Sequence, residues 1–128
     1  MGNNDLKIEM KKKIYGWTID LVNFVDGLSK TMSVKIIASQ LMRSGTSIGA
    51  NYIEAQAASS RKDFTNFIHH SLKSANESRF WLALLRDTEK ADKNRTEALL
   101  KKLEEICKIL GASLLTPKIS FIRALTRM

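Results

Sequence analysis

The sequence is poor in residues that interrupt helices. Its 128 residues include one proline, Pro117, and only six glycines, and these two residue types are the usual breaks in helical sequence. The single cysteine, Cys107, cannot form a disulfide within the chain, which favours a reducing compartment. No apolar run approaches the roughly 18 residues that span a bilayer, and the first residues lack the apolar centre of a signal peptide. We therefore expect long helices, a cytoplasmic location and no membrane segment.

The composition is that of an ordinary globular domain with an excess of positive charge. Hydrophobic residues make up 44% of the chain and charged residues 27%, which are typical values for a folded domain. We expect residues 1–128 to form a single domain, since this is a common domain length. The formal net charge is +8, and the excess leans toward residues 91–128. Such a balance suits a polyanionic partner such as nucleic acid, although a merely basic surface explains it equally well.

Apolar residues recur every three or four positions through most of the chain, which is the spacing of amphipathic helices. This spacing predicts helices over about residues 6–28, 33–57, 61–87 and 93–115. Ser60 and Asp63 have the spacing of a helix N-cap with an acidic residue in the first turn. No strand pattern competes, so we expect an all-α protein, an antiparallel up-down-up-down four-helix bundle. In the C-terminal tail, residues 117–128, apolar and basic residues alternate. This pattern predicts a short amphipathic turn that docks on another surface.

The stretch SGTSIGAN, residues 44–51, holds two glycines and raises the question of a phosphate-binding loop. It matches neither the P-loop nor the dinucleotide-binding pattern, and no strand precedes it. The helical stripe from Val34 to Tyr52 continues through it without a slip in phase. Gly45 and Gly49 therefore lie on one helical face, where each costs about 1 kcal/mol relative to alanine. We expect the close approach of a second helix to offset that cost.

No group of residues predicts metal binding or a nucleophile. His69 and His70 are adjacent, so they point about 100° apart on a helix and cannot chelate one ion from one face. Cys107 lies on an apolar stripe, which favours a core position over a reactive thiol. Since no acid, base and nucleophile converge, we expect a non-enzymatic protein without a metal or cofactor.

Asn51 and Glu54 lie three residues apart, beside the apolar stripe of the second helix. A partly buried carboxylate in this position can act as a general acid or base, but within a bundle it is more often paired. We favour the paired interpretation, with Arg79 or Lys73 of the third helix as the partner of Glu54.

The basic residues are the candidates for a binding role. They cluster near the start of the first and third helices and on the polar face of the fourth. The eight candidate nucleic-acid contacts are Lys11, Lys12, Lys13, Arg61, Lys62, Lys101, Lys102 and Lys108. No aromatic RNA-binding motif, zinc finger or helix-turn-helix accompanies them, so we expect contacts mainly to phosphates. An ordinary solvated face is the alternative explanation.

The segment from residue 39 to residue 85 carries a specific pattern. It runs through RSGTSIGAN at residues 43–51 and continues with Glu54, Ala55, Ser60, Asp63, Phe64, Lys73, Ala75, Glu77, Trp81 and Leu82. In this pattern the chain resembles the four-helix-bundle family of 23S rRNA intervening-sequence proteins, also called the S23 ribosomal protein family. We take as its structural motif residues Arg43, Gly45, Gly49, Asn51, Glu54, Asp63 and Trp81.

The resemblance implies a homo-oligomer, with a pentameric barrel as the known arrangement, and offers no catalytic residues. The family is similar to the accessory variability determinant of diversity-generating retroelements, a basic pentamer that binds nucleic acid and the reverse transcriptase. We therefore expect a non-enzymatic, basic, oligomeric bundle that contacts the backbone of RNA or DNA. The alternative is a protein–protein adaptor or assembly scaffold whose positive charge is incidental, because the third helix and the tail carry more apolar surface than a lone bundle must bury.

Overall fold

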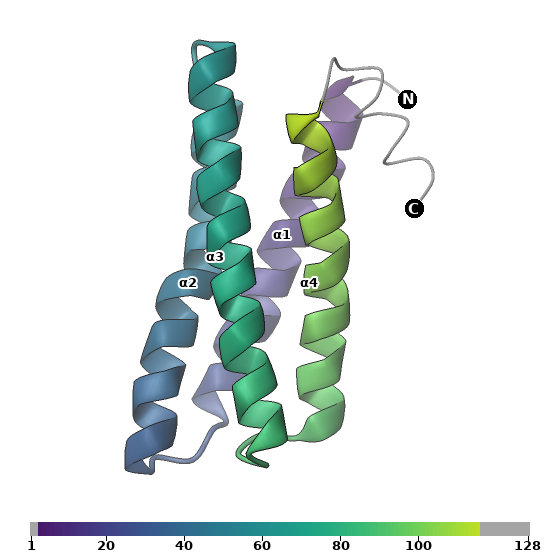
Figure 1. The fold of residues 1–128 in the computed structure, drawn as a ribbon. Helices are drawn as coiled ribbons and strands as arrows, with labels where there is room; N and C mark the ends of the chain where they lie inside the picture. The colour runs from purple at the N-terminus through teal and green to yellow at the C-terminus, as the bar shows by residue number, and fades with distance from the viewer. Residues whose placement is uncertain (1–2, 116–128) are drawn as a thin grey trace.

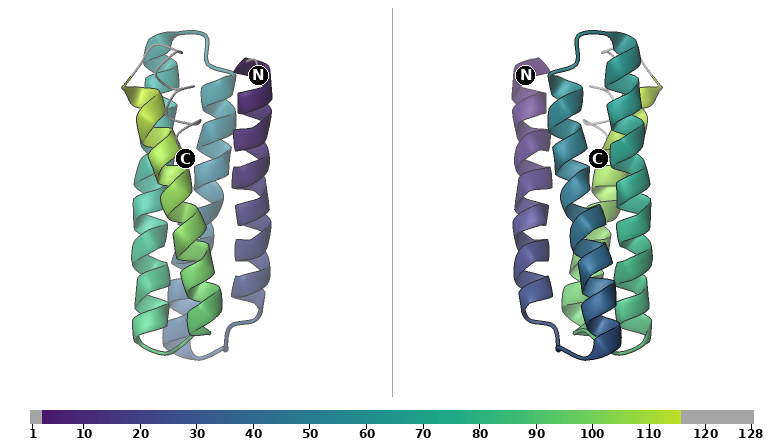
Figure 2. Two further views of the ribbon diagram at one scale, coloured as in Figure 1. Left: turned by 90° about the vertical axis from the view of Figure 1, so that its right-hand side faces the viewer. Right: turned by 90° about the vertical axis from the view of Figure 1, so that its left-hand side faces the viewer.

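A computed structural model describes residues 3–115 of the protein. Within these residues the chain forms four α-helices and no strand, so the expectation of an all-α protein with four helices is confirmed. The helices are α1 (Asn3–Asp26), α2 (Met32–Gln56), α3 (Arg61–Asp87) and α4 (Lys93–Leu114). The helices lie side by side, and the connections between them lie at alternate ends of the molecule (Figures 1 and 2). The tail expected at residues 117–128 lies outside the described residues.

The helix ends differ from the predicted ends by three residues at most. The first helix begins at Asn3 instead of residue 6 and ends at Asp26 instead of residue 28, while α3 spans the predicted 61–87. The predicted N-cap is present, because the Ser60 hydroxyl accepts a hydrogen bond from the Asp63 backbone N–H over 3.1 Å. None of the helices in the described range is long and apolar enough to cross a membrane.

The apolar stripes of the four helices meet in one core. Each helix packs on two neighbours, with α1 between α2 and α4, and α3 also between α2 and α4. The largest fully buried side chains include Trp17, Leu21, Leu41, Ile48, Ile68, Leu82, Leu85, Leu103, Ile106 and Leu110. Burial of each such side chain contributes about 1.5–3 kcal/mol of hydrophobic stabilisation. The core is therefore the main source of stability, and it draws on all four helices.

Short hydroxyl side chains fill the buried seam between α2 and α3, which we call the serine seam. The Ser78 Oγ lies 2.8 Å from the Ser44 Oγ, and the Ser74 Oγ lies 3.0 Å from the Ser47 Oγ. Residue numbers along this seam rise on α2 as they fall on α3. Because each hydroxyl has a partner, the seam brings two helices together without an unsatisfied buried polar group.

Gly45 and Gly49 face α1 across a very short gap. A Cβ atom on Gly45 would lie 2.1 Å from Leu21 Cδ2, and one on Gly49 would lie 3.2 Å from Ile14 Cγ2. A Cβ atom does not approach a non-bonded carbon atom as closely as 2.1 Å. Leu21 therefore occupies the space that a side chain at position 45 would need. The two glycines are therefore packing residues within a helix, and α1 is the helix that approaches them.

The packing of α1 on Gly45 predicts a large loss of stability for Gly45→Leu. Overpacking at a buried helix contact lowers the free energy of unfolding by about 3 kcal/mol. The control is Gly16→Leu, because a Cβ there meets nothing within 4 Å, and the better helix former raises that free energy by roughly 0.5–1 kcal/mol. Urea unfolding followed by circular dichroism measures both. Equal stability of the two variants would contradict the close-packing explanation.

Tyr52 carries a buried hydroxyl without a hydrogen-bond partner among residues 3–115. The residue is only 3% exposed. Burial disfavours the charged phenolate and raises the pKa of Tyr52 from 10.0 to about 12. A buried, unsatisfied hydroxyl also lowers stability, because the bond it makes to water in the unfolded chain is not replaced.

Tyr52→Phe should therefore raise the free energy of unfolding by about 1 kcal/mol at neutral pH. Because burial raises the pKa in the folded state, the unfolded chain releases the phenolic proton first, so the wild type loses stability as the pH rises from 10.0 toward about 12. Urea midpoints at pH 8 and across this range measure both effects, and the variant should lose less stability than the wild type. The exposed Tyr15 supplies the control, since its hydroxyl is solvated and Tyr15→Phe should leave the stability at pH 8 unchanged. A destabilised Tyr52→Phe variant would show that the hydroxyl is satisfied.

Candidate nucleic-acid interface

Lys13 and Lys102, two of the predicted basic residues, each form an ion pair across the contact between α1 and α4. The Lys13 Nζ lies 3.1 Å from a Glu105 carboxylate oxygen, and the Lys102 Nζ lies 3.7 Å from a carboxylate oxygen of Asp20. The four side chains are 40–58% exposed, so each ion pair contributes at most about 1 kcal/mol. Exposed pairs of this kind are weak enough for a phosphate to compete with the carboxylate.

Lys101 and Lys108 are exposed on the outer side of α4. They are seven residues apart, which places them on one face of the helix. Neither forms an ion pair within the described part of the chain. We call the surface formed by Lys13 of α1 and by Arg95, Lys101, Lys102 and Lys108 of α4 the α4 basic surface.

The other predicted basic residues lie elsewhere. Lys11 lines a separate groove between α1 and α2, and Lys12 is exposed on α1. Arg61 joins the start of α3 to the end of α4, because its Nη2 donates to the Ser113 carbonyl over 3.2 Å. Lys62 is exposed beside it. Of the predicted basic residues, Lys101, Lys102 and Lys108 thus lie on α4. Lys11, Lys12, Arg61 and Lys62 lie on other parts of the bundle.

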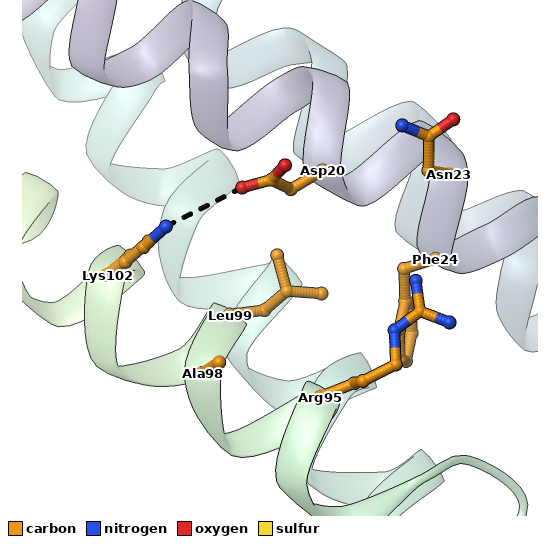
Figure 3. Close-up of a pocket in the computed structure, with 7 residues that line it drawn as sticks. All are labelled: Asp20, Asn23, Phe24, Arg95, Ala98, Leu99 and Lys102. Atoms are coloured by element: carbon orange, nitrogen blue, oxygen red, sulfur yellow. Dashed lines mark ion pairs between the residues drawn. The ribbon is translucent and has the colours of Figure 1, made fainter.

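A groove of about 290 Å³ opens between α1 and α4 (Figure 3). Its lining residues are Asp20, Asn23 and Phe24 from α1 and Arg95, Ala98, Leu99 and Lys102 from α4. Arg95 and Lys102 are seven residues apart, or about 10.5 Å along the helix axis. The groove therefore has a cationic side chain toward each end, polar groups on the α1 side and apolar groups between them.

Arg95 is held at its end of the groove by contacts with both helices. The Asp92 carboxylate accepts a hydrogen bond from the Arg95 backbone N–H over 2.9 Å and caps α4. The guanidinium lies 5.6 Å from the centre of the Phe24 ring, which is a cation–π arrangement. It also reaches the region of Gly27 at the end of α1, where the helix dipole favours a cation. The side chain is thus positioned before any ligand binds.

Trp17 links α1 to α4 through a hydrogen bond to Leu99, a lining residue of this groove. Its Nε1 donates a hydrogen bond to the Leu99 carbonyl over 3.0 Å, and the indole is buried. A buried indole N–H needs such a partner, and the bond contributes about 1 kcal/mol. Because Leu99 itself lines the groove, the hydrogen bond fixes one wall of the groove relative to the other.

Asp20, Asn23 and Arg95 were not among the sites predicted from the sequence. The spacing of Arg95, Leu99 and Lys102, four and then three residues, is the signal that places them along one side of a helix. That spacing alone does not reveal that Asp20 and Asn23 face the same side. The groove becomes visible only when α1 is known to be the neighbour of α4.

The motif residues on α2 and α3 form a polar network on the surface. The Arg43 guanidinium forms an ion pair with Glu77 and donates to the Gln40 side chain over 3.1 Å. The same Glu77 carboxylate accepts a hydrogen bond from Trp81 Nε1 over 3.0 Å. Asn51 bonds within its own helix, because its Nδ2 donates to the Ser47 carbonyl over 2.9 Å. Arg43 and Trp81 thus meet at Glu77 on the surface where α2 packs on α3, whereas Asn51 bonds only within α2.

The expectation for Glu54 is wrong. Its side chain is exposed and forms no ion pair within residues 3–115, and the proposed partner Arg79 pairs instead with Glu104 of α4 at 3.3 Å. Successive residues of a helix are rotated by about 100°. Ala55 therefore points into the core, while its neighbour Glu54 points to solvent.

Cys107, His69 and His70 are the remaining reactive side chains considered in the sequence analysis. Cys107 is half-buried against the core, and burial raises the pKa of its thiol, which disfavours the nucleophilic thiolate. His69 and His70 are exposed. The described residues contain no group of three or more acidic, histidine or cysteine side chains that could hold a metal ion.

Comparison with known proteins agrees with the fold. The family model described as 23S rRNA-intervening sequence protein matches residues 7–112, a range that reaches into all four helices. A solved structure of a protein with unknown function from the S23 ribosomal protein family of Bacteroides thetaiotaomicron VPI-5482 is similar, with 37% sequence identity and a TM-score of 0.78. The match covers 84% of this chain and 99% of that chain. No protein with a curated description matches. The resemblance carried by residues 39–85 is thereby confirmed, and the chain belongs to the 23S rRNA-intervening sequence protein family.

Proposed function

We propose that this protein is a non-enzymatic, cytoplasmic, antiparallel up-down-up-down bundle that binds RNA or DNA through backbone phosphates. The observation that carries the proposal is the α4 basic surface, on which Arg95 and Lys102 of α4 line an open groove between α1 and α4. Phosphate neutralisation by such side chains releases counterions and favours binding without base recognition. The family name refers to an intervening sequence of 23S rRNA, and the expected likeness to the retroelement accessory protein points the same way.

Fluorescence anisotropy with a structured RNA and a duplex DNA tests this proposal at low and moderate salt. We expect affinity to fall steeply with salt for the wild type. The double variant Lys101→Glu with Lys108→Glu should bind more weakly, and its plot of log affinity against log salt should be less steep by about 2. Both positions are exposed and outside any ion pair in the described range, so the fold should be retained.

The matched control is Lys30→Glu with Lys35→Glu. These lysines are exposed near the connection between α1 and α2, and the change in net charge is the same. We expect this control to retain most of the affinity of the wild type. An affinity that does not depend on salt concentration, or an equal loss of affinity in both double variants, would contradict a phosphate-binding surface on α4.

We further propose that the protein is a homo-oligomer, with the pentamer favoured by the family resemblance. Ile8, Tyr15 and Ile19 are 50%, 68% and 46% exposed, and their spacing places them on one face of α1. Ile36 of α2 and Phe80 of α3 are exposed as well. Contact between one apolar face and a different face on the next copy is heterologous, and such contacts form a ring when the rotation from copy to copy closes.

Light scattering tests the oligomer at micromolar concentration. The wild type should have several times the monomer mass, and Tyr15→Glu with Ile19→Glu should shift it toward the monomer because charges in an apolar interface are costly. The control is Asn66→Glu with Asn76→Glu, which adds the same charge at exposed positions of α3 and should leave the mass unchanged. A wild-type monomer would refute the oligomer.

The alternative function, a protein–protein adaptor or scaffold, is favoured by one observation. Phe80 is 58% exposed and packs edge-on against Trp81, with 4.9 Å between the ring centres. Exposed aromatic groups of this kind are typical of protein interfaces. Partners recovered in a pull-down that survive nuclease treatment, and that are lost with Phe80→Ala, would favour the adaptor.

A further inference from the structure

We propose that the groove between α1 and α4 holds one unstacked nucleobase, so that the protein recognises unpaired nucleic-acid strands. This inference rests on the nucleic-acid binding proposed above and adds a base-contacting site to a surface that otherwise contacts phosphates. The groove lies on the α4 basic surface, because Arg95 and Lys102 belong to both (Figure 3).

The size and lining of the groove suit a single flat ring. Its volume of about 290 Å³ is near the lower limit of roughly 300 Å³ for small-molecule sites. Ala98 and Leu99 supply an apolar surface between the charged ends. A base stacked in a duplex presents only its edge and cannot enter between two helices, whereas a base in a single strand can be turned out of its stack.

Arg95 offers a plane on which a base can stack. One side of its guanidinium lies over the Phe24 ring at 5.6 Å, and the side chain is exposed at the groove. Bases stack on guanidinium planes as they do on aromatic rings. The contact with Phe24 holds the guanidinium in place, so little side-chain freedom is lost when a base binds.

The α1 side of the groove distinguishes among bases by hydrogen bonding. The Asp20 carboxylate is only an acceptor, and the Asn23 amide is both a donor and an acceptor. At 3.7 Å from Lys102 Nζ, the Asp20 carboxylate retains free acceptor capacity. A carboxylate selects bases that carry an exocyclic amine, such as cytosine, over uracil and thymine. We therefore expect cytosine to bind more tightly than uracil.

The flanking phosphates find cations on both sides of the base. Lys102 lies toward one end of the groove and Arg95 toward the other, about 10.5 Å apart along α4. Lys101 follows directly on the outer side of the helix. A strand laid along α4 therefore places its backbone on lysines while one base turns inward.

Ala98→Trp tests the site, because it fills the groove without a change in charge. Anisotropy should be measured with labelled oligo(C) and oligo(U) of about 15 nucleotides, and with a duplex of equal length. We expect the wild type to bind oligo(C) about tenfold more tightly than oligo(U). Ala98→Trp should weaken oligo(C) binding about tenfold and leave duplex binding within about twofold.

Two further variants make the result decisive. Asn76→Trp, at an exposed position of α3, introduces the same side chain away from the groove and should bind like the wild type. Asp20→Ala should remove the preference for oligo(C) over oligo(U) while duplex binding persists. Circular dichroism verifies folding, and Ala98→Leu replaces Ala98→Trp if the larger side chain prevents it.

The outcomes separate the two proposals. If the wild type binds no nucleic acid at low salt, the proposed function fails and this inference fails with it. If the duplex and both oligonucleotides bind, but Ala98→Trp changes none of them or weakens all equally, the groove is no base site and phosphate binding still stands. Equal affinity for oligo(C) and oligo(U) in the wild type would likewise overturn the base contacts.

Discussion

The contact between Leu21 and Gly45 determines how close α1 lies to α2. The position of α1 in turn determines one wall of the groove between α1 and α4. Leu21 fills the space where a side chain at residue 45 would begin, and the edge of the Trp17 indole lies 3.6 Å from the same point. The opposite side of that indole donates to the Leu99 carbonyl. Trp17 therefore spans the bundle from the glycine on α2 to the wall of the groove on α4. The packing at Gly45 on α2 therefore influences the position of a surface on the far side of α1.

Charge on the α4 basic surface is interleaved with carboxylates, and this shapes what the surface can do. Asp20 and Glu105 lie against Lys102 and Lys13, so a polyanion must compete with groups that are already in place. Exposed ion pairs of this kind are readily exchanged. We therefore expect the proposed binding to phosphates alone to be modest and to depend on salt, and a contact in the groove would add selectivity.

Helical periodicity was sufficient to predict the number and extent of the helices and the packing role of the glycines, because both depend on the spacing of residues along one helix. It fails for Glu54, because a rotation of about 100° per residue carries this position beside the apolar stripe into solvent. It also missed Arg95, whose role depends on Phe24 and Asn23 of another helix. Periodicity shows which face of a helix is buried but not which helix covers that face. A groove between two helices can be predicted only when the neighbouring helix is known.

The serine seam between α2 and α3 is built from neutral hydroxyl groups, which neither titrate near neutral pH nor attract counterions. Its hydrogen bonds, from Ser44 with Ser78 to Ser47 with Ser74, should persist under ionic conditions that weaken every exposed ion pair. The serine seam is thus an uncharged part of the α2–α3 contact, whereas the Arg43–Glu77 ion pair of the same two helices lies at the surface. A response of this protein to salt or mild acid should therefore originate at its surface, while the relative placement of these two helices stays constant.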